Sequence, residues 1–211
     1  MRAYIFDLDG VLVDTAKYHF LAWKHICDTL NLKFDEKFNE HLKGVSRDRC
    51  LDLILEYNDI NISNDKKKKY LIKKNEVYLN YINSLTENDL LPGAIKLLSE
   101  CKKKHLFICL GSASKNALLI LNKLGITHFF DVIIDGNKVT KAKPDPDVFY
   151  QSCIQLDIKP QECVVFEDSL AGLQAAKSIN MKTVGIGNNP TLSIADIVID
   201  SLADFKANLI L

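Results

Sequence analysis

Two carboxylates, Asp7 and Asp9, stand two residues apart at the end of an apolar run and are followed at once by Gly10. Side chains at positions i and i+2 of extended backbone point to the same side, so both should face the crevice beyond the carboxyl end of a buried strand. A divalent cation would relieve their mutual repulsion, and hard oxygen ligands suit Mg²⁺. With Mg²⁺ and a phosphoryl group at hand, Asp7 can act as a nucleophile and Asp9 can move protons. Two solvated carboxylates are the alternative for this pair taken alone.

Three later places in the chain carry further groups that suit phosphate chemistry. Ser112 follows a second apolar run, and Ser114 opens a predicted helix, where hydroxyl and free N–H groups favour a phosphate. Taken alone, each serine is more often an ordinary helix N-cap. Lys143 adds a cation in a loop, and Glu167 with Asp168 forms a second acidic pair after another apolar run. Because parallel strands end at one edge of a sheet, these groups together predict one phosphoryl-transfer site.

The elements that must position these groups alternate between strand and helix after a strong boundary at Leu91-Pro92-Gly93. This alternation predicts a Rossmann-like α/β core with a parallel sheet covered on both faces. Residues 15–91 instead show helical periodicity and predict an α-helical cap domain inserted into a core of residues 1–14 and 92–211. The strands are expected at 4–6, 106–110, 132–134, 163–166, 183–186 and 197–199, and the core helices at 94–103, 115–124, 147–156 and 170–179.

Composition narrows the class of protein. The 211 residues hold 27 Lys plus Arg and 27 Asp plus Glu, a balance that argues against a nucleic-acid surface, and the lysine run at 66–69 is predicted to be a solvated helix face. The six cysteines form no C-x-x-C pair and are expected to be reduced and mostly buried, as in a cytoplasmic protein. No apolar stretch is long enough for a membrane, and the chain enters its first strand without a leader.

The order of these motifs resembles the haloacid dehalogenase superfamily of phosphotransferases over nearly the whole chain. The resemblance rests on Asp7-Leu8-Asp9-Gly10, Ser112, Lys143-Pro144 and Glu167-Asp168-Ser169. It implies that Asp7 is the nucleophile and Asp9 the general acid/base. It also implies that Ser112 and Lys143 hold the transferring phosphoryl group. Mg²⁺ would be bound by Asp7, the Asp9 carbonyl, Glu167 and Asp168.

The cap resembles that of the sugar phosphomutases within this superfamily, which implies interconversion of β-D-glucose 1-phosphate and D-glucose 6-phosphate through a bisphosphate and an aspartyl phosphate. A phosphomutase must hold a second, distal phosphate, which the resemblance gives to Arg47, Ser114, Lys115 and Asn116. Thr15 would lie at the cap hinge, and His19 would orient Asp9 or a sugar hydroxyl unless it only packs. The remaining sugar-site residues implied are Trp23, Gly44, Val45, Ser46, Lys74 and Ala113. Cys50 departs from the pattern, since a serine facing the sugar is expected there.

Two other readings compete with the phosphomutase. A sugar-phosphate or phosphoglycolate-type phosphatase would use the same core residues, so only the cap separates it. A receiver-type signalling module also combines a parallel α/β fold with a phosphorylated aspartate, but an insertion directly after the first acidic pair counts against it. The preferred expectation is a monomer that acts on small sugar phosphates and binds neither nucleic acid nor membranes.

Overall fold

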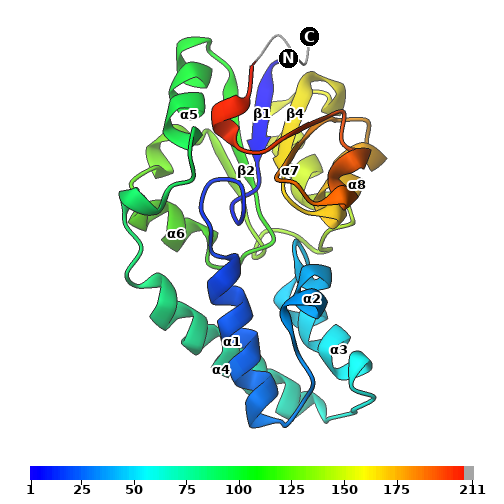
Figure 1. Cartoon of the computed structure of the whole chain (residues 1–211). Coiled ribbons are helices and arrows are strands. Elements are labelled where there is room, and N and C mark those ends of the chain that lie inside the picture. Colours follow the sequence, from blue (N-terminus) through cyan, green and yellow to red (C-terminus); the bar gives the residue numbers. More distant parts are fainter. Residues whose placement is uncertain (207–211) are drawn as a thin grey trace.

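The computed structural model describes residues 1–206, and its core is a six-stranded parallel sheet with the order β3-β2-β1-β4-β5-β6 (Figure 1). The central strand β1 pairs with β2 on one side and with β4 on the other, so Asp7 follows a strand that is flanked on both edges. The strands are β1 Ala3–Phe6, β2 Phe107–Gly111, β3 Val132–Ile134, β4 Cys163–Glu167, β5 Lys182–Ile186 and β6 Ile197–Ile199.

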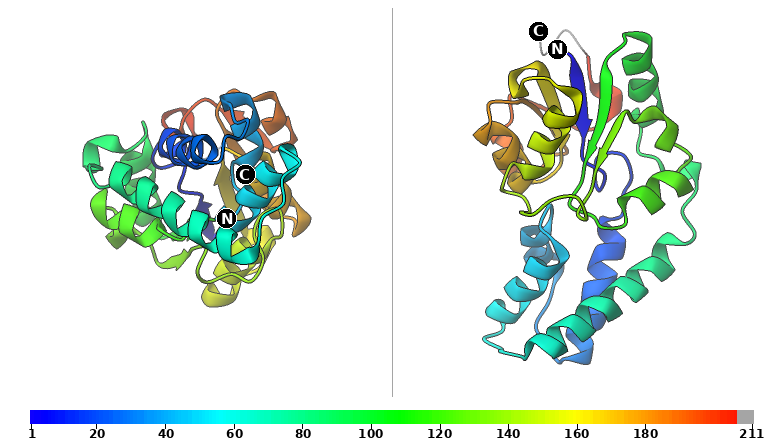
Figure 2. Two further views of the ribbon diagram at one scale, coloured as in Figure 1. Left: turned by 90° about the horizontal axis from the view of Figure 1, so that it is seen from below. Right: turned by 180° about the vertical axis from the view of Figure 1, so that it is seen from behind.

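Helices cover both faces of this sheet, as Figures 1 and 2 show. Tyr4 and Phe6 of β1 belong to the apolar cluster that includes α5 and α6, whereas Ala3 and Ile5 belong to the cluster that includes α7 and α8. Alternate residues of a strand point to opposite faces, so a strand buried on both faces is apolar throughout. The core helices are α5 Ala94–Lys103, α6 Ala117–Lys123, α7 Asp147–Leu156 and α8 Leu170–Ser178.

Four helices between β1 and β2 lie together beyond the carboxyl ends of the strands (Figure 1). They enclose an apolar cluster of their own around Trp23, Leu51 and Ile54. Tyr78 and Ile82 at the end of the fourth helix pack instead into the core cluster, which joins this segment to the sheet. The four helices are α1 Ala16–Thr29, α2 Glu36–Asn39, α3 Arg47–Tyr57 and α4 Asn64–Ile82.

Short 3₁₀ helices occupy several of the connections. They span Glu40–Leu42, Glu87–Asp89, Thr127–Phe129, Pro160–Glu162, Pro190–Ile194 and Leu202–Asp204. Within residues 1–206, no helix combines the length and the apolar character needed to cross a membrane.

The α/β fold class predicted from the sequence is confirmed, and the six strands lie where the apolar runs placed them. Two predicted helix ends are also found, because Gly125 and Asn180 adopt the left-handed conformation with φ of +69° and +60°. The helix expected from residue 115 begins at Ala117 instead, since the hydroxyl of Ser114 accepts a hydrogen bond from the Asn116 N–H and forms a turn there. All six cysteines are buried free thiols, as expected.

Candidate active site

The ammonium group of Lys143 is the centre of a buried ion cluster directly behind the end of β1. Its Nζ donates to Asp7 Oδ1 at 2.6 Å, to Glu167 Oε1 at 2.5 Å and to the Gly111 carbonyl at 2.9 Å. The side chains of Lys143 and Glu167 are fully buried, so no water competes for these three bonds. The three strands β1, β2 and β4 therefore each supply one acceptor to a single cation.

Burial and charge act in opposite directions on this cluster. Burial raises the pKa of Asp7 to about 6, although the Lys143 ammonium acts to lower it. Burial works against the charge of Lys143 as well, but the carboxylates of Asp7 and Glu167 outweigh that effect and raise its pKa. Asp7 is thus mostly ionised at neutral pH and Lys143 is fully charged, which is the state that a nucleophilic carboxylate beside a phosphoryl group needs.

The Asp9 side chain has different neighbours, which come from the helical segment. The Thr15 hydroxyl donates to Asp9 Oδ1, and the Nε2 atom of His19 lies 3.9 Å from the same oxygen. The other ring nitrogen of His19, Nδ1, is 2.8 Å from Nζ of Lys74. When Lys74 is protonated it can only donate, and a neutral His19 then carries its ring proton on Nε2, on the side of Asp9.

The surroundings push the pKa of Asp9 in the direction that a general acid needs. Burial and the nearby Asp7 carboxylate raise the pKa of Asp9 to about 8, whereas Lys74 acts to lower it. Burial lowers the pKa of Lys74 to about 7 and, together with Lys74, holds the pKa of His19 well below its ordinary value. Two carboxylates two residues apart therefore differ in protonation, which separates a nucleophile from an acid/base.

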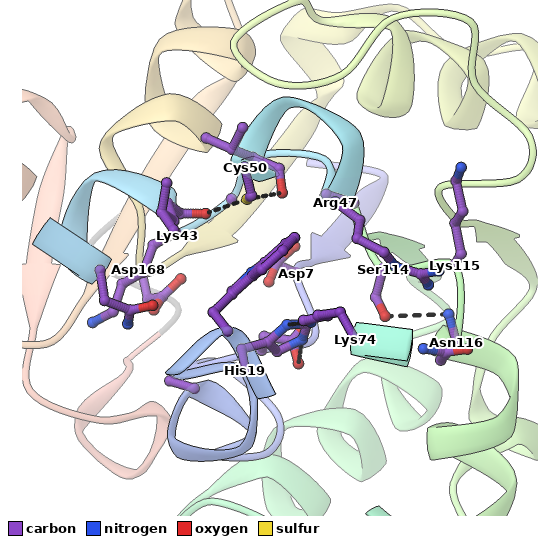
Figure 3. A pocket seen from close by; sticks show the side chains of 18 residues that line it. Asp7, His19, Lys43, Arg47, Cys50, Lys74, Ser114, Lys115, Asn116 and Asp168 are labelled. Carbon is purple, nitrogen blue, oxygen red and sulfur yellow. Dashed lines mark hydrogen bonds and ion pairs between the residues drawn. The ribbon is translucent and has the colours of Figure 1, made fainter. Parts of the chain in front are cut away.

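The end of β2 brings a run of polar side chains to the opposite side of the crevice. Ser112 is fully buried, and its hydroxyl accepts from the Ser114 N–H at 3.1 Å. The next two side chains, Lys115 and Asn116, donate to Asp48 and Asn75 of the helical segment. Figure 3 shows Ser114, Lys115 and Asn116 together on one side of the cavity. This run is thus held by its own turn on one side and by the four-helix segment on the other.

One cavity of about 830 Å³, part of it open to solvent, lies between the sheet edge and the four helices (Figure 3). Of the sequence-predicted site residues, five are not among those that line it, namely Thr15, Ser46, Ser112, Lys143 and Glu167. The predicted residues that line it are Asp7, Asp9, His19, Trp23, Gly44, Val45, Arg47, Lys74, Ala113, Ser114, Lys115, Asn116 and Asp168. Five further lining residues were not predicted as site residues, namely Ala16, Asn39, Leu42, Lys43 and Cys50.

The loop before α3 approaches the core closely and depends on a glycine. Gly44 has φ of +72°, and a Cβ atom there would lie 2.4 Å from the Ser169 hydroxyl. The carbonyls of Leu42 and Val45, on either side of this glycine, both lie 3.6 Å from Sγ of Cys50. Cys50 thus lines the cavity where the serine was expected and holds the loop by two long S–H contacts.

The acidic residues that face the cavity fit a divalent cation. Burial and the charges of Glu167 and Asp7 raise the pKa of Asp168 well above its ordinary value, which marks a concentration of negative charge at this edge of the sheet. Gly10, with φ of +79°, lets the backbone after Asp9 come so close that a Cβ would lie 2.1 Å from Asp168 Oδ2. Among residues 1–206, no three His, Cys, Asp or Glu side chains form a metal-ligating group. Asp7 and Asp168 both line the cavity, and Mg²⁺ takes few carboxylates and completes its shell with phosphate and water.

Glu167, a predicted Mg²⁺ ligand, has core partners on both of its carboxylate oxygens. Its Oε1 accepts from Lys143, and its Oε2 accepts from the backbone N–H and the hydroxyl of Ser169 at 2.9 and 2.8 Å. Both oxygens are engaged inside the core, so this carboxylate orients Lys143 and leaves Asp168 as the member of the pair that faces the cavity.

A parallel sheet with these four motifs at its carboxyl edge defines a class of phosphotransferase, and the chain belongs to the haloacid dehalogenase-like hydrolase family, whose model matches residues 4–186. It is 42% identical over 212 residues to a β-phosphoglucomutase of Bacillus subtilis, covering 100% of this chain and 94% of the relative. It is 31% identical over 188 residues to a phosphorylated carbohydrates phosphatase of Thermotoga maritima, covering 87% and 84%.

Solved structures show the same similarity as the sequence comparison. A crystal structure of β-phosphoglucomutase from Clostridium difficile superposes with a TM-score of 0.94 at 43% sequence identity, over 99% of this chain and 94% of that one. The similarity therefore includes the helical segment as well as the sheet.

Proposed function

We propose that this protein interconverts β-D-glucose 1-phosphate and D-glucose 6-phosphate, the reaction of a β-phosphoglucomutase. The observation that carries the proposal is one cavity with phosphate-binding groups at two ends. One end has Asp7 backed by Lys143, and the other has Arg47 with the run Ser114, Lys115 and Asn116. A phosphatase needs the first end alone. A mutase needs both, because its substrate carries one reacting and one parked phosphate.

The chemistry follows from the two carboxylates. An oxygen of Asp7 attacks the phosphorus of a phosphate donor, the bond from phosphorus to the leaving oxygen breaks, and Asp9 gives that oxygen a proton. When a sugar monophosphate is bound, Asp9 takes a proton from the sugar hydroxyl, which attacks phospho-Asp7 and regenerates the carboxylate. The sugar bisphosphate then reorients, so that its other phosphate lies at Asp7, and transfers that phosphate to the Asp7 carboxylate. Lys143 and Ser112 stabilise the charge on the transferring oxygens.

Mg²⁺ is part of the proposal as the cofactor. Asp7, the Asp9 carbonyl, Glu167 and Asp168 would hold it, and when bound it would neutralise charge on the phosphoryl oxygens. Residues 15–91 are proposed as a cap domain that excludes water when closed, with Thr15 at its hinge and Trp23 in the wall of the sugar site. The working unit is proposed to be a monomer in the cytoplasm, where six free thiols stay reduced.

The arginine at the distal end offers the sharpest test of a mutase against a phosphatase. Arg47→Ala should cut glucose 6-phosphate formation at least about 100-fold, the loss expected for a charge-assisted, two-point phosphate contact. Hydrolysis of a small phosphate ester that carries one phosphate should stay within about twofold of wild type. Equal losses in the two assays would refute the distal-phosphate role.

Arg49→Ala is the matched control. Arg49 lies two residues further along α3 and is paired with Glu56 at 2.6 Å on the exposed surface, away from the cavity. Its replacement should leave both rates unchanged.

A sugar-phosphate phosphatase is the second candidate, favoured by the similarity to the Thermotoga maritima phosphatase. It predicts that free phosphate accounts for all the sugar phosphate consumed by the wild-type protein.

A further inference from the structure

We propose that Asp48 and Asn75 are positioning residues that latch the helical segment 15–91 onto the core through Lys115 and Asn116. The inference deepens the proposed function and rests on it, since it gives these two distal-phosphate residues a second task. We call the two cross-contacts the cap latch.

The cap latch consists of two interactions on neighbouring residues of one core turn. Lys115 Nζ lies 3.3 Å from Asp48 Oδ2 of α3, and Asn116 Nδ2 donates to Asn75 Oδ1 of α4 at 2.9 Å. The turn itself is fixed from the core side, because Asn137 Nδ2 donates to the Lys115 carbonyl at 2.9 Å. Two different helices of the cap are thereby tied to one rigid point of the core.

The latch leaves the phosphate-binding capacity of both core residues available. A lysine ammonium has three N–H donors and a carboxamide nitrogen has two. Asp48 uses one donor of Lys115, and Asn75 uses one donor of Asn116, so each residue retains at least one N–H for a phosphate oxygen. A bound phosphate and a closed cap are therefore compatible, and each holds these side chains in the orientation that the other requires.

The latch residues do not belong to the cavity wall. The side chain of Asp48 is 59% exposed, and neither Asp48 nor Asn75 lines the cavity. Each directly follows a residue that does line it, since Asp48 comes after Arg47 and Asn75 after Lys74. Fixing Asp48 and Asn75 therefore fixes the positions of a distal-phosphate arginine and of the lysine that supports the His19 ring beside Asp9.

This arrangement gives the cap latch a defined effect on the reaction. Phospho-Asp7 reacts with water when the cap is open and with a sugar hydroxyl when it is closed. A donor without a distal phosphate, such as acetyl phosphate, does not depend on the latch. Weakening the latch should therefore raise hydrolysis relative to mutase turnover without slowing the phosphorylation of Asp7.

The test uses Asp48→Asn, Asn75→Ala and the double variant, with glucose 6-phosphate and free phosphate measured together from β-glucose 1-phosphate. Each single variant should raise the ratio of free phosphate to glucose 6-phosphate about fivefold, the upper end for an exposed polar pair, and the double variant should raise it further. Phosphorylation by acetyl phosphate should stay within about twofold of wild type. Glu56→Gln and Glu76→Gln are matched controls, because they break the pairs Arg49–Glu56 and Lys73–Glu76, which lie within single cap helices.

A second readout does not depend on turnover. Trp23 is the single tryptophan and lines the cavity, so acrylamide quenching of its fluorescence reports cap opening. The latch variants should show a higher quenching constant than wild type and the controls. An unchanged product ratio with unchanged quenching would overturn the latch. A lower KM for sugar phosphate in Asp48→Asn would also overturn it, since Asp48 would then only compete with phosphate for Lys115. If wild type forms no glucose 6-phosphate, the proposed function fails, and the quenching comparison still decides the latch.

Discussion

Replacing Lys143 by methionine should destabilise the protein as well as inactivate it. The substitution keeps the length of the side chain and removes its charge. In the native protein this ammonium is fully buried and holds the carboxylates of Asp7 and Glu167 at 2.6 and 2.5 Å. Without it, two buried carboxylates share one site with no cation between them.

The size of this loss of stability follows from the burial of the Lys143 ammonium. Removing one partner of a buried ion pair costs about 3–5 kcal/mol, because the remaining charge stays desolvated. For a chain of this size each kcal/mol lowers Tm by about 2–4 °C, so Lys143→Met should melt about 6–20 °C below wild type. Burial already raises the pKa of Asp7 to about 6 while Lys143 acts to lower it, so its loss raises that pKa further. A folded-state pKa above the unfolded value makes stability fall as pH rises, so the deficit should be larger at pH 8 than at pH 5.

Thermal and urea unfolding of the metal-free protein at the two pH values measure this deficit. Lys102→Met is the matched control, because Lys102 pairs with Asp131 at 2.7 Å but has a 39% exposed side chain. Its loss should cost less than about 1 kcal/mol. A Lys143 variant within about 1 kcal/mol of wild type at pH 8 would refute the claim that this cation holds the cluster together.

Two further predictions concern the cation and the cap loop. Burial raises the pKa values of Asp7 and Asp9 to about 6 and about 8, so these two groups destabilise the metal-free fold as pH rises. Added Mg²⁺ should therefore raise Tm more at pH 8 than at pH 5 in a thermal-shift assay. An equal rise at the two pH values would contradict the cation site. Gly44→Ala places a methyl group 2.4 Å from the Ser169 hydroxyl in a residue with φ of +72°. Mutase turnover should fall at least about tenfold, while hydrolysis of a small phosphate ester persists. Mutase turnover at the wild-type level would show that the loop can shift to accept the methyl group.

The sequence predicted the core well because its signals are local. An apolar run followed by Asp7, Leu8, Asp9 and Gly10 specifies a buried strand, two carboxylates on one side and a left-handed turn. The parallel order then brings Lys143 and Asp168 to the same edge, since strands separated by helices end on one side of a sheet.

The contacts between the cap and the core carried no such local signal. His19 and Lys74 are 55 residues apart, and Asn75 and Asn116 are 41 residues apart, so their contacts depend on how α4 packs against α1 and how the whole segment sits on the sheet. The resemblance implied Glu167 as a metal ligand but gave no sign of its contact with Lys143, which is 24 residues away in the sequence. Two of the missed cavity residues stand next to predicted ones, since Ala16 follows Thr15 and Lys43 precedes Gly44, and this adjacency could have added them.

Trapping the phosphorylated protein tests the account most directly. Wild type and Asp7→Asn would be phosphorylated with acetyl phosphate and Mg²⁺, and the site and fate of the phosphoryl group followed by mass spectrometry of the peptide that contains residue 7. A phosphomutase should carry an aspartyl phosphate on Asp7 in wild type only. That phosphoryl group should pass to glucose monophosphate, giving a sugar bisphosphate, much faster than it passes to water. Discharge to free phosphate alone, at a rate that sugar phosphate does not change, would contradict it.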